Sequence, residues 1–181
     1  MSEIDHAMTT AAESLLSALP PGGRRHACYP FTGPARSQWS YLPGSRRGIA
    51  LSELGTAGRK AAHRLLATSL SRTAFAQAVT IMAFEEVLDL DEQGRLGRHS
   101  SGYHVAICGS PGDDGWAWRF EGHHLSVNVT VVAGQPVVAP LFLGANPAQV
   151  RHANHAHTVL RRPGRDFGAA LLASHLAAER P

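Results

Sequence analysis

The sequence contains little cysteine and no long hydrophobic run. Its two cysteines, Cys28 and Cys108, are isolated and fit neither a disulfide framework nor a zinc knuckle, so we expect them to be core thiols. No stretch approaches the roughly 20 apolar residues that a membrane helix needs, and we expect no membrane partner. The N-terminal residues lack a basic region followed by an apolar run, which predicts a cytoplasmic protein rather than a secreted one.

Lysine is also scarce, because Lys60 is the only one among the 17 basic residues that give a net charge of +3. The arginines are scattered, and no basic stripe alternates with aromatic residues, so we expect no nucleic-acid partner. A length of 181 residues fits a single domain, 1–181. Within it, residues 1–23 would form an N-terminal helix and a linker.

Helical spacing of apolar residues is confined to the first half of the chain and to its end. It predicts an amphipathic helix over residues 5–19, and residues 24–48 then follow as an irregular segment rich in turn formers. Thr56 would cap a helix over 57–70, and Ser71 or Thr73 would begin a second one that reaches Val87. These two helices would form a helical hairpin. A final helix is predicted over residues 167–179.

Alternating apolar residues predict four strands between the helix that reaches Val87 and the helix over residues 167–179. The connections between them are short, which favours an antiparallel meander. We therefore expect an α+β domain, in which an N-terminal helical layer packs on an antiparallel sheet and a C-terminal helix closes it. The predicted strands cover residues 103–108, 116–121, 124–132 and 137–142.

Histidine is abundant, and five of the eleven histidines fall between residues 123 and 157. The apolar positions are even-numbered before Gly122 and odd-numbered after it. A bulge or tight bend at Gly122 would produce that change, and would put His123 at the bend. His124 would then share one strand face with Ser126, Asn128 and Thr130.

A second histidine pair, His155 and His157, would point the same way on an extended chain and could chelate one ion. Together with His123 and His124, it would give three or four imidazole ligands. Such a set suits copper, iron or zinc and does not suit calcium or magnesium, which prefer oxygen. Asn128 and Asn154 could orient these ligands or serve as turn and capping residues.

Four motifs stand out in the sequence: Trp39-x-Tyr41-x-Pro43, Gly122-His123-His124-Leu125-Ser126-x-Asn128, Gly144-Ala145-Asn146-Pro147 and Asn154-His155-x-His157. Together they resemble a bacterial family of unknown function, DUF3500, over roughly residues 30–178. The resemblance defines 24–178 as a family-like core, and implies a shortened member that lacks a middle segment between residues 147 and 154. Either a partner subunit supplies the missing wall of the pocket, which suggests a homodimer, or the site is more open.

The function that these patterns favour is a metal-dependent enzyme acting on a small organic molecule. An all-imidazole site leads us to expect redox chemistry with copper or iron, and a zinc-dependent hydrolase or lyase is the first alternative. Tyr103 could donate a hydrogen bond near the metal, and Arg119 and Glu121 could bind and protonate the substrate or simply pair across strands. A second alternative is a protein without catalytic activity, either a binding module or an inactive shortened homologue.

Overall fold

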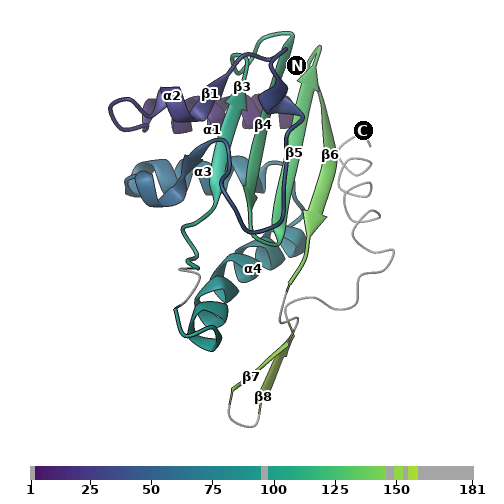
Figure 1. Ribbon diagram of the computed structural model, residues 1–181. Coiled ribbons are helices and arrows are strands. Elements are labelled where there is room, and N and C mark those ends of the chain that lie inside the picture. The colour runs from purple at the N-terminus through teal and green to yellow at the C-terminus, as the bar shows by residue number, and fades with distance from the viewer. Residues whose placement is uncertain (1–2, 95–97, 146–148, 153–154, 159–181) are drawn as a thin grey trace, which may run out of the picture.

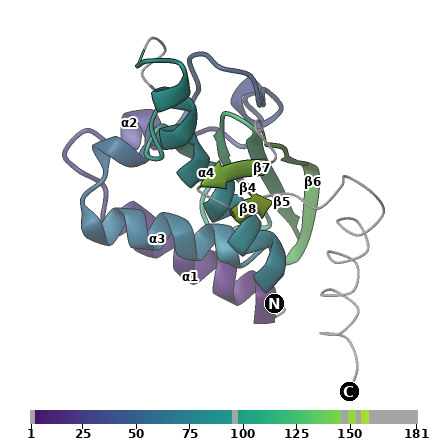
Figure 2. The ribbon, with the colours of Figure 1, turned by 90° about the horizontal axis from the view of Figure 1, so that it is seen from below.

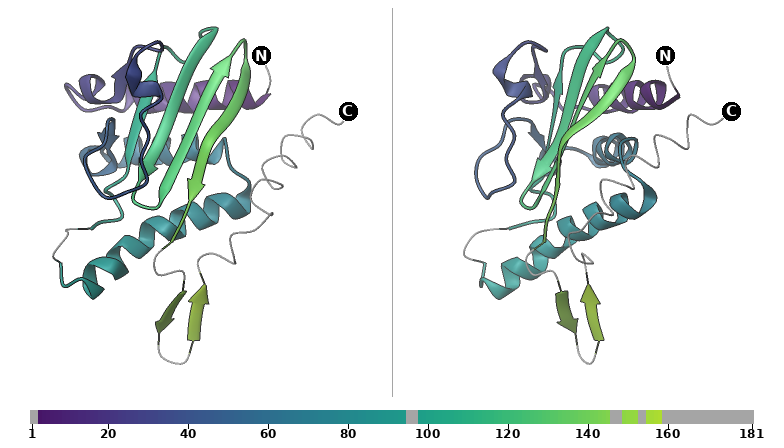
Figure 3. Two further views of the ribbon diagram at one scale, coloured as in Figure 1. Left: turned by 45° about the vertical axis from the view of Figure 1, so that its right-hand side comes forward. Right: turned by 90° about the vertical axis from the view of Figure 1, so that its right-hand side faces the viewer.

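The computed structural model describes residues 3–94, 98–145, 149–152 and 155–158, with the backbone alone in the last two ranges (Figure 1). The expected α+β class is confirmed: helices cover one face of a sheet that is mostly antiparallel (Figure 3). The helix predicted over residues 167–179 lies outside the described residues. Among the described residues, no helix has the length and apolar character needed to cross a membrane.

The main sheet has the strand order β1-β3-β4-β5-β6, and β2 also pairs with β3. Its last four strands are the predicted antiparallel meander. The first two strands have two residues each, so they are too short to show an alternating pattern and were not predicted. The strands are β1 (Cys28–Tyr29), β2 (Ile49–Ala50), β3 (His104–Cys108), β4 (Gly115–Gly122), β5 (Leu125–Val132) and β6 (Gln135–Leu143).

Three long helices accompany this sheet. α1 (Glu3–Ser17) and α3 (Thr56–Ala67) lie side by side on one face, and α4 (Arg72–Asp91) runs across the lower end (Figures 1 and 2). The predicted hairpin of α3 and α4 is therefore wrong. Small buried side chains on both α1 and α3 let these two helices approach closely instead. Shorter helical pieces are α2 (Arg24–Ala27), η1 (Pro34–Arg36) and η2 (Leu51–Glu53).

The helix starts show one correct and one wrong prediction. The Ser71 hydroxyl accepts a hydrogen bond from the Ala74 backbone N–H at 3.2 Å, which caps α4 as expected. Thr56 is not a cap, because α3 begins at that residue and Gly55 precedes it in an extended conformation without a side-chain cap.

Both faces of the central strands are buried. The core face carries Trp116, Trp118 and Phe120 from β4, which pack with the valines of β5 and with α1 and α3. The opposite face carries polar side chains, which the segment 30–48 covers (Figure 3). The contacts between that segment and the sheet include two hydrogen bonds: Arg119 donates to the Ala35 carbonyl at 2.8 Å, and the Ser40 N–H donates to Glu121 at 3.0 Å.

Candidate metal centre

His123 and His124 form a two-residue turn between β4 and β5. Gly122 pairs directly with Leu125, so the even-numbered apolar residues of β4 lie opposite the odd-numbered apolar residues of β5. The tight bend explains the change of parity, and the strands pair across it without a bulge. The expected polar row begins only at Ser126, because His124 lies in the turn with a φ of 60°.

Gly122 is required because the ring of Tyr103 packs directly on it. A Cβ atom at residue 122 would lie 2.2 Å from Tyr103 Cδ1, which is far inside contact distance. The Tyr103 hydroxyl donates to the His123 carbonyl at 2.8 Å, and burial raises the pKa of this phenol above its usual range. Tyr103 is thus a neutral donor that holds the backbone of the turn. Its predicted role toward a metal stays a prediction.

Two further backbone hydrogen bonds hold His124. Its N–H donates to the Tyr41 carbonyl at 3.0 Å, and its carbonyl accepts from the Gly144 N–H at 2.8 Å. The turn is therefore connected both to the segment 30–48 and to the end of β6.

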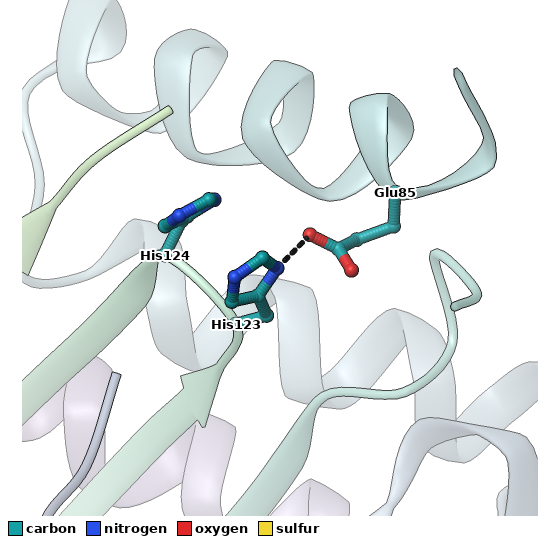
Figure 4. Close-up of side chains that lie close together, drawn as sticks. All are labelled: Glu85, His123 and His124. Atoms are coloured by element: carbon teal, nitrogen blue, oxygen red, sulfur yellow. Dashed lines mark hydrogen bonds and ion pairs between the residues drawn. The ribbon is translucent and has the colours of Figure 1, made fainter. Parts of the chain in front are cut away.

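Glu85 of α4 faces this turn from a buried position. Its Oε1 lies 2.8 Å from His123 Nδ1 (Figure 4), and only 4% of the residue is exposed. Glu85 was not predicted from the sequence. The sequence does contain a pattern that could have indicated it. Glu85 falls at helical spacing among the buried positions Ile81, Met82 and Leu88, where a carboxylate needs a partner.

Arg98 supplies the positive charge beside this carboxylate. Its Nη1 lies 2.8 Å from His123 Nδ1 and 3.8 Å from Glu85 Oε2. Glu92 binds the same guanidinium through two hydrogen bonds, at 2.6 Å to Nε and 2.9 Å to Nη2. Such bidentate pairing fixes the plane of the guanidinium.

Burial shifts the protonation of all three groups toward their neutral forms. It raises the pKa of Glu85 to about 7, although the charge of Arg98 acts in the opposite direction. It lowers the pKa of His123 and of His124 to about 4 in each case, and Arg98 adds to both shifts. At neutral pH both imidazoles are uncharged, so each has a nitrogen lone pair available.

These three side chains lie close enough together to be candidate ligands of one ion. One donor atom from each of Glu85, His123 and His124 lies within 4.8 Å of the other two. The two imidazole rings are stacked, with centroids 3.6 Å apart (Figure 4). Two imidazoles and one carboxylate form a ligand set used for zinc and for iron(II).

The second predicted histidine pair lies on a separate hairpin. β7 (Gln149–His152) and β8 (His155–Thr158) form a two-stranded sheet beyond α4 (Figure 1). His155 and His157 are extended, as expected, and pair with His152 and Val150. Their side chains are not among the described parts of the structure, nor is Asn154, so their convergence on His123 and His124 stays a prediction.

The remaining predicted residues lie on the sheet face below the segment 30–48. Arg119 and Glu121 form a buried ion pair at 3.1 Å within β4, rather than across two strands. Asn128 donates to Ser126 Oγ at 3.0 Å and to the Pro140 carbonyl at 2.9 Å. Among the hydrogen bonds of the described residues, Asn128 makes none to the two histidines of the turn.

The protein is an α+β domain with two histidines and a buried glutamate at one end of its sheet. The family model for a protein of unknown function, DUF3500, matches residues 2–154, and the chain belongs to that family. The matched residues include α1 and the His123–His124 turn and end before His155. No curated protein and no solved structure matches the chain.

We predict that Gly122→Ala lowers the free energy of unfolding by about 3 kcal/mol or more, because the new methyl overlaps the buried Tyr103 ring. Chemical denaturation measures this. In a Tyr103→Leu background the smaller side chain can move aside, so the same change should cost distinctly less. Equal costs in the two backgrounds would show that the ring does not pack on Gly122.

We also predict that His124 makes the metal-free protein less stable in acid. The folded pKa of about 4 lies below the ordinary value of 6.5, so only the unfolded chain takes up this proton between those two values. Stability should therefore fall with decreasing pH in that window, relative to a His124→Asn variant, by up to about 1.4 kcal/mol per pH unit. Denaturation at several pH values tests this, with exposed His26→Asn as the control. Parallel curves for wild type and His124→Asn would contradict it.

Proposed function

We propose that Glu85, His123 and His124 bind one divalent transition-metal ion, and that the chain is a metal-dependent enzyme acting on a small organic molecule. The single observation that carries this proposal is the buried carboxylate of Glu85, which faces a turn made of two histidines. A buried carboxylate is costly unless it is paired. A cation held between it and two neutral imidazoles would satisfy all three groups.

The separation of the donor atoms supports chelation. Glu85 Oε1 and His123 Nδ1 are 2.8 Å apart. Ligand bonds of about 2.0–2.1 Å place neighbouring donor atoms about 2.8–3.4 Å apart when they subtend 90–110° at the metal. The pair thus fits two adjacent coordination positions. His124 would supply a third ligand from the same turn.

The ligand set favours iron(II) or zinc over copper. Glu85 adds a carboxylate to the imidazoles, and the combination of two histidines and one carboxylate is typical of mononuclear iron oxygenases and of catalytic zinc sites. Three protein ligands leave positions open for substrate, water or dioxygen. We therefore propose iron-dependent redox chemistry first, with zinc-dependent hydrolysis or lysis as the alternative.

Arg98 favours a second candidate, in which the cluster is a metal-free ion network that fastens α4 to the turn. Its guanidinium already contacts His123 Nδ1, where a metal would bind. The two candidates differ in what Arg98 does. In a metal site it repels the ion, whereas in a structural network it is an essential partner of Glu85.

Elemental analysis of protein purified without added metal tests the metal proposal. We predict close to one equivalent of iron or zinc in the wild type and its loss in Glu85→Gln and His123→Asn, because each change removes a ligand. His26→Gln, at an exposed histidine, is the matched control and should keep the metal. A wild type without metal, or a Glu85→Gln variant that keeps its full content, would contradict the proposal.

The same measurement on a His155→Ala/His157→Ala double variant decides between two ligand sets. Retained metal supports Glu85, His123 and His124 as the complete protein set. Metal lost from both this variant and Glu85→Gln would make the hairpin histidines additional ligands of the same ion.

Arg98→Gln distinguishes the metal site from the ion network. We predict that it tightens binding of zinc or iron(II) by at least about tenfold, because it removes a positive charge next to the metal. Competition against a chelator of known affinity measures this, with Arg72→Gln at the exposed start of α4 as the control. Weaker binding in Arg98→Gln, together with a large loss of stability, would support the structural network instead.

A further inference from the structure

A cavity of about 500 Å³ lies between the segment 38–47 and β4, on the sheet face that carries Arg119 and Glu121. Its volume is within the range of pockets that bind small molecules. None of the three candidate metal ligands lines it. The lining residues that matter for its chemistry are Trp39, Ser40, Ser45, Arg46, Arg47 and Glu121.

The charge of this cavity is positive. Arg46 and Arg47 both line it, and Glu121 is the acidic residue among the lining side chains. Glu121 is already neutralised, because it pairs with Arg119 at 3.1 Å and accepts the Ser40 N–H at 3.0 Å. The two arginines therefore leave a net positive charge that an anionic ligand would complement.

Both arginines are oriented and still have donors to offer. Each terminal nitrogen of Arg46 donates one of its two N–H groups, to the carbonyl of Gly44 or of Leu42, and keeps the other. Its Nε is buried and has no hydrogen-bond partner among the described residues. Arg47 donates from Nε to Gln38 Oε1 at 2.9 Å, which leaves its terminal nitrogens for a ligand. A guanidinium held in this way is suited to bind a carboxylate or a phosphate.

Trp39 provides a flat apolar wall beside these charges. It is 37% exposed, whereas Trp116 and Trp118 are buried in the core. The Tyr41 ring lies 6.0 Å from the Trp39 ring, centroid to centroid, and stacks on the Phe142 ring at 4.2 Å. The Trp39 ring is thus packed against a second aromatic ring, which is itself stacked on β6. A ligand with a planar ring could stack on the open part of the indole.

We propose that this cavity binds a small organic anion in which a planar ring carries a carboxylate or a phosphate group. The anionic group pairs with Arg46 and Arg47, Ser40 and Ser45 provide hydroxyl groups, and the ring packs on Trp39. The segment that lines the cavity also accepts the His124 N–H through Tyr41. A ligand bound in the cavity is thus expected to change the environment of the His124 amide through this hydrogen bond.

Titration of the full-length, metal-free protein followed by ¹⁵N–¹H NMR tests this proposal independently of any metal. Benzoate and phenyl phosphate are the probes, and benzyl alcohol and inorganic phosphate are the controls that lack the charge or the ring. We expect both anionic probes to shift the Trp39 indole N–H, assigned with Trp39→Phe, and the His124 amide. The indole signals of buried Trp116 and Trp118 should stay in place. The tighter of the two probes identifies the preferred anionic group.

Arg47→Gln is the decisive variant, because Arg47 is exposed and its loss should leave the fold intact. We expect it to weaken binding of the better probe by at least about tenfold, while Arg72→Gln leaves binding unchanged. Equal binding by Arg47→Gln and wild type would overturn the proposal. So would benzyl alcohol binding as tightly as benzoate, or no shift of the Trp39 signal at millimolar probe. A protein that binds no metal could still pass this test.

Discussion

The packing of the Tyr103 ring on Gly122 fixes the place of the His123–His124 turn, and the rest of the candidate site depends on it. Only a residue without a side chain allows the ring to approach so closely. The same tyrosine then holds the turn backbone through its hydroxyl. Because the turn is also bonded to Tyr41 and Gly144, its position is determined by β3, by β6 and by the segment that covers the sheet. Two imidazoles are thereby directed at α4 by contacts that involve no metal.

Burial and the charged residues around this turn determine the protonation of its two histidines. Glu85 lies where a helix would ordinarily place an apolar side chain, and it is stabilised there by His123 and Arg98. Arg98 is in turn held by Glu92, which directly follows the end of α4. Glu85 on α4 therefore faces the turn, while Glu92 orients the guanidinium beside it. Burial keeps the imidazoles neutral, which is the form that binds metals. The segment 38–47 lines the cavity and also accepts the His124 N–H through the Tyr41 carbonyl, so the proposed anion pocket and the candidate metal centre share one structural element.

The sequence predicted the elements that carry a regular pattern and missed those that depend on distant contacts. The meander follows from alternation, and the tight bend at residues 123–124 follows from the change of parity after Gly122. β1 and β2 are too short to show a pattern. The pairing of α3 with α1 depends on small side chains rather than on chain order, so the hairpin prediction failed. Glu85 was hidden within the apolar spacing of α4, and Arg98 reaches the turn only in the folded chain. The second histidine pair was found from its spacing, but its part in the site stays a prediction.

X-ray absorption spectroscopy at the metal edge of the isolated wild-type protein tests whether Glu85, His123 and His124 together bind one ion. Imidazole rings give characteristic outer-shell scattering, and carboxylate ligands contribute only the nearest oxygen. We predict a mononuclear site with two imidazoles and at least one oxygen ligand at about 2.0–2.2 Å. A spectrum with imidazoles and no oxygen ligand, or one that contains no imidazole scattering at all, would contradict a centre built from Glu85, His123 and His124.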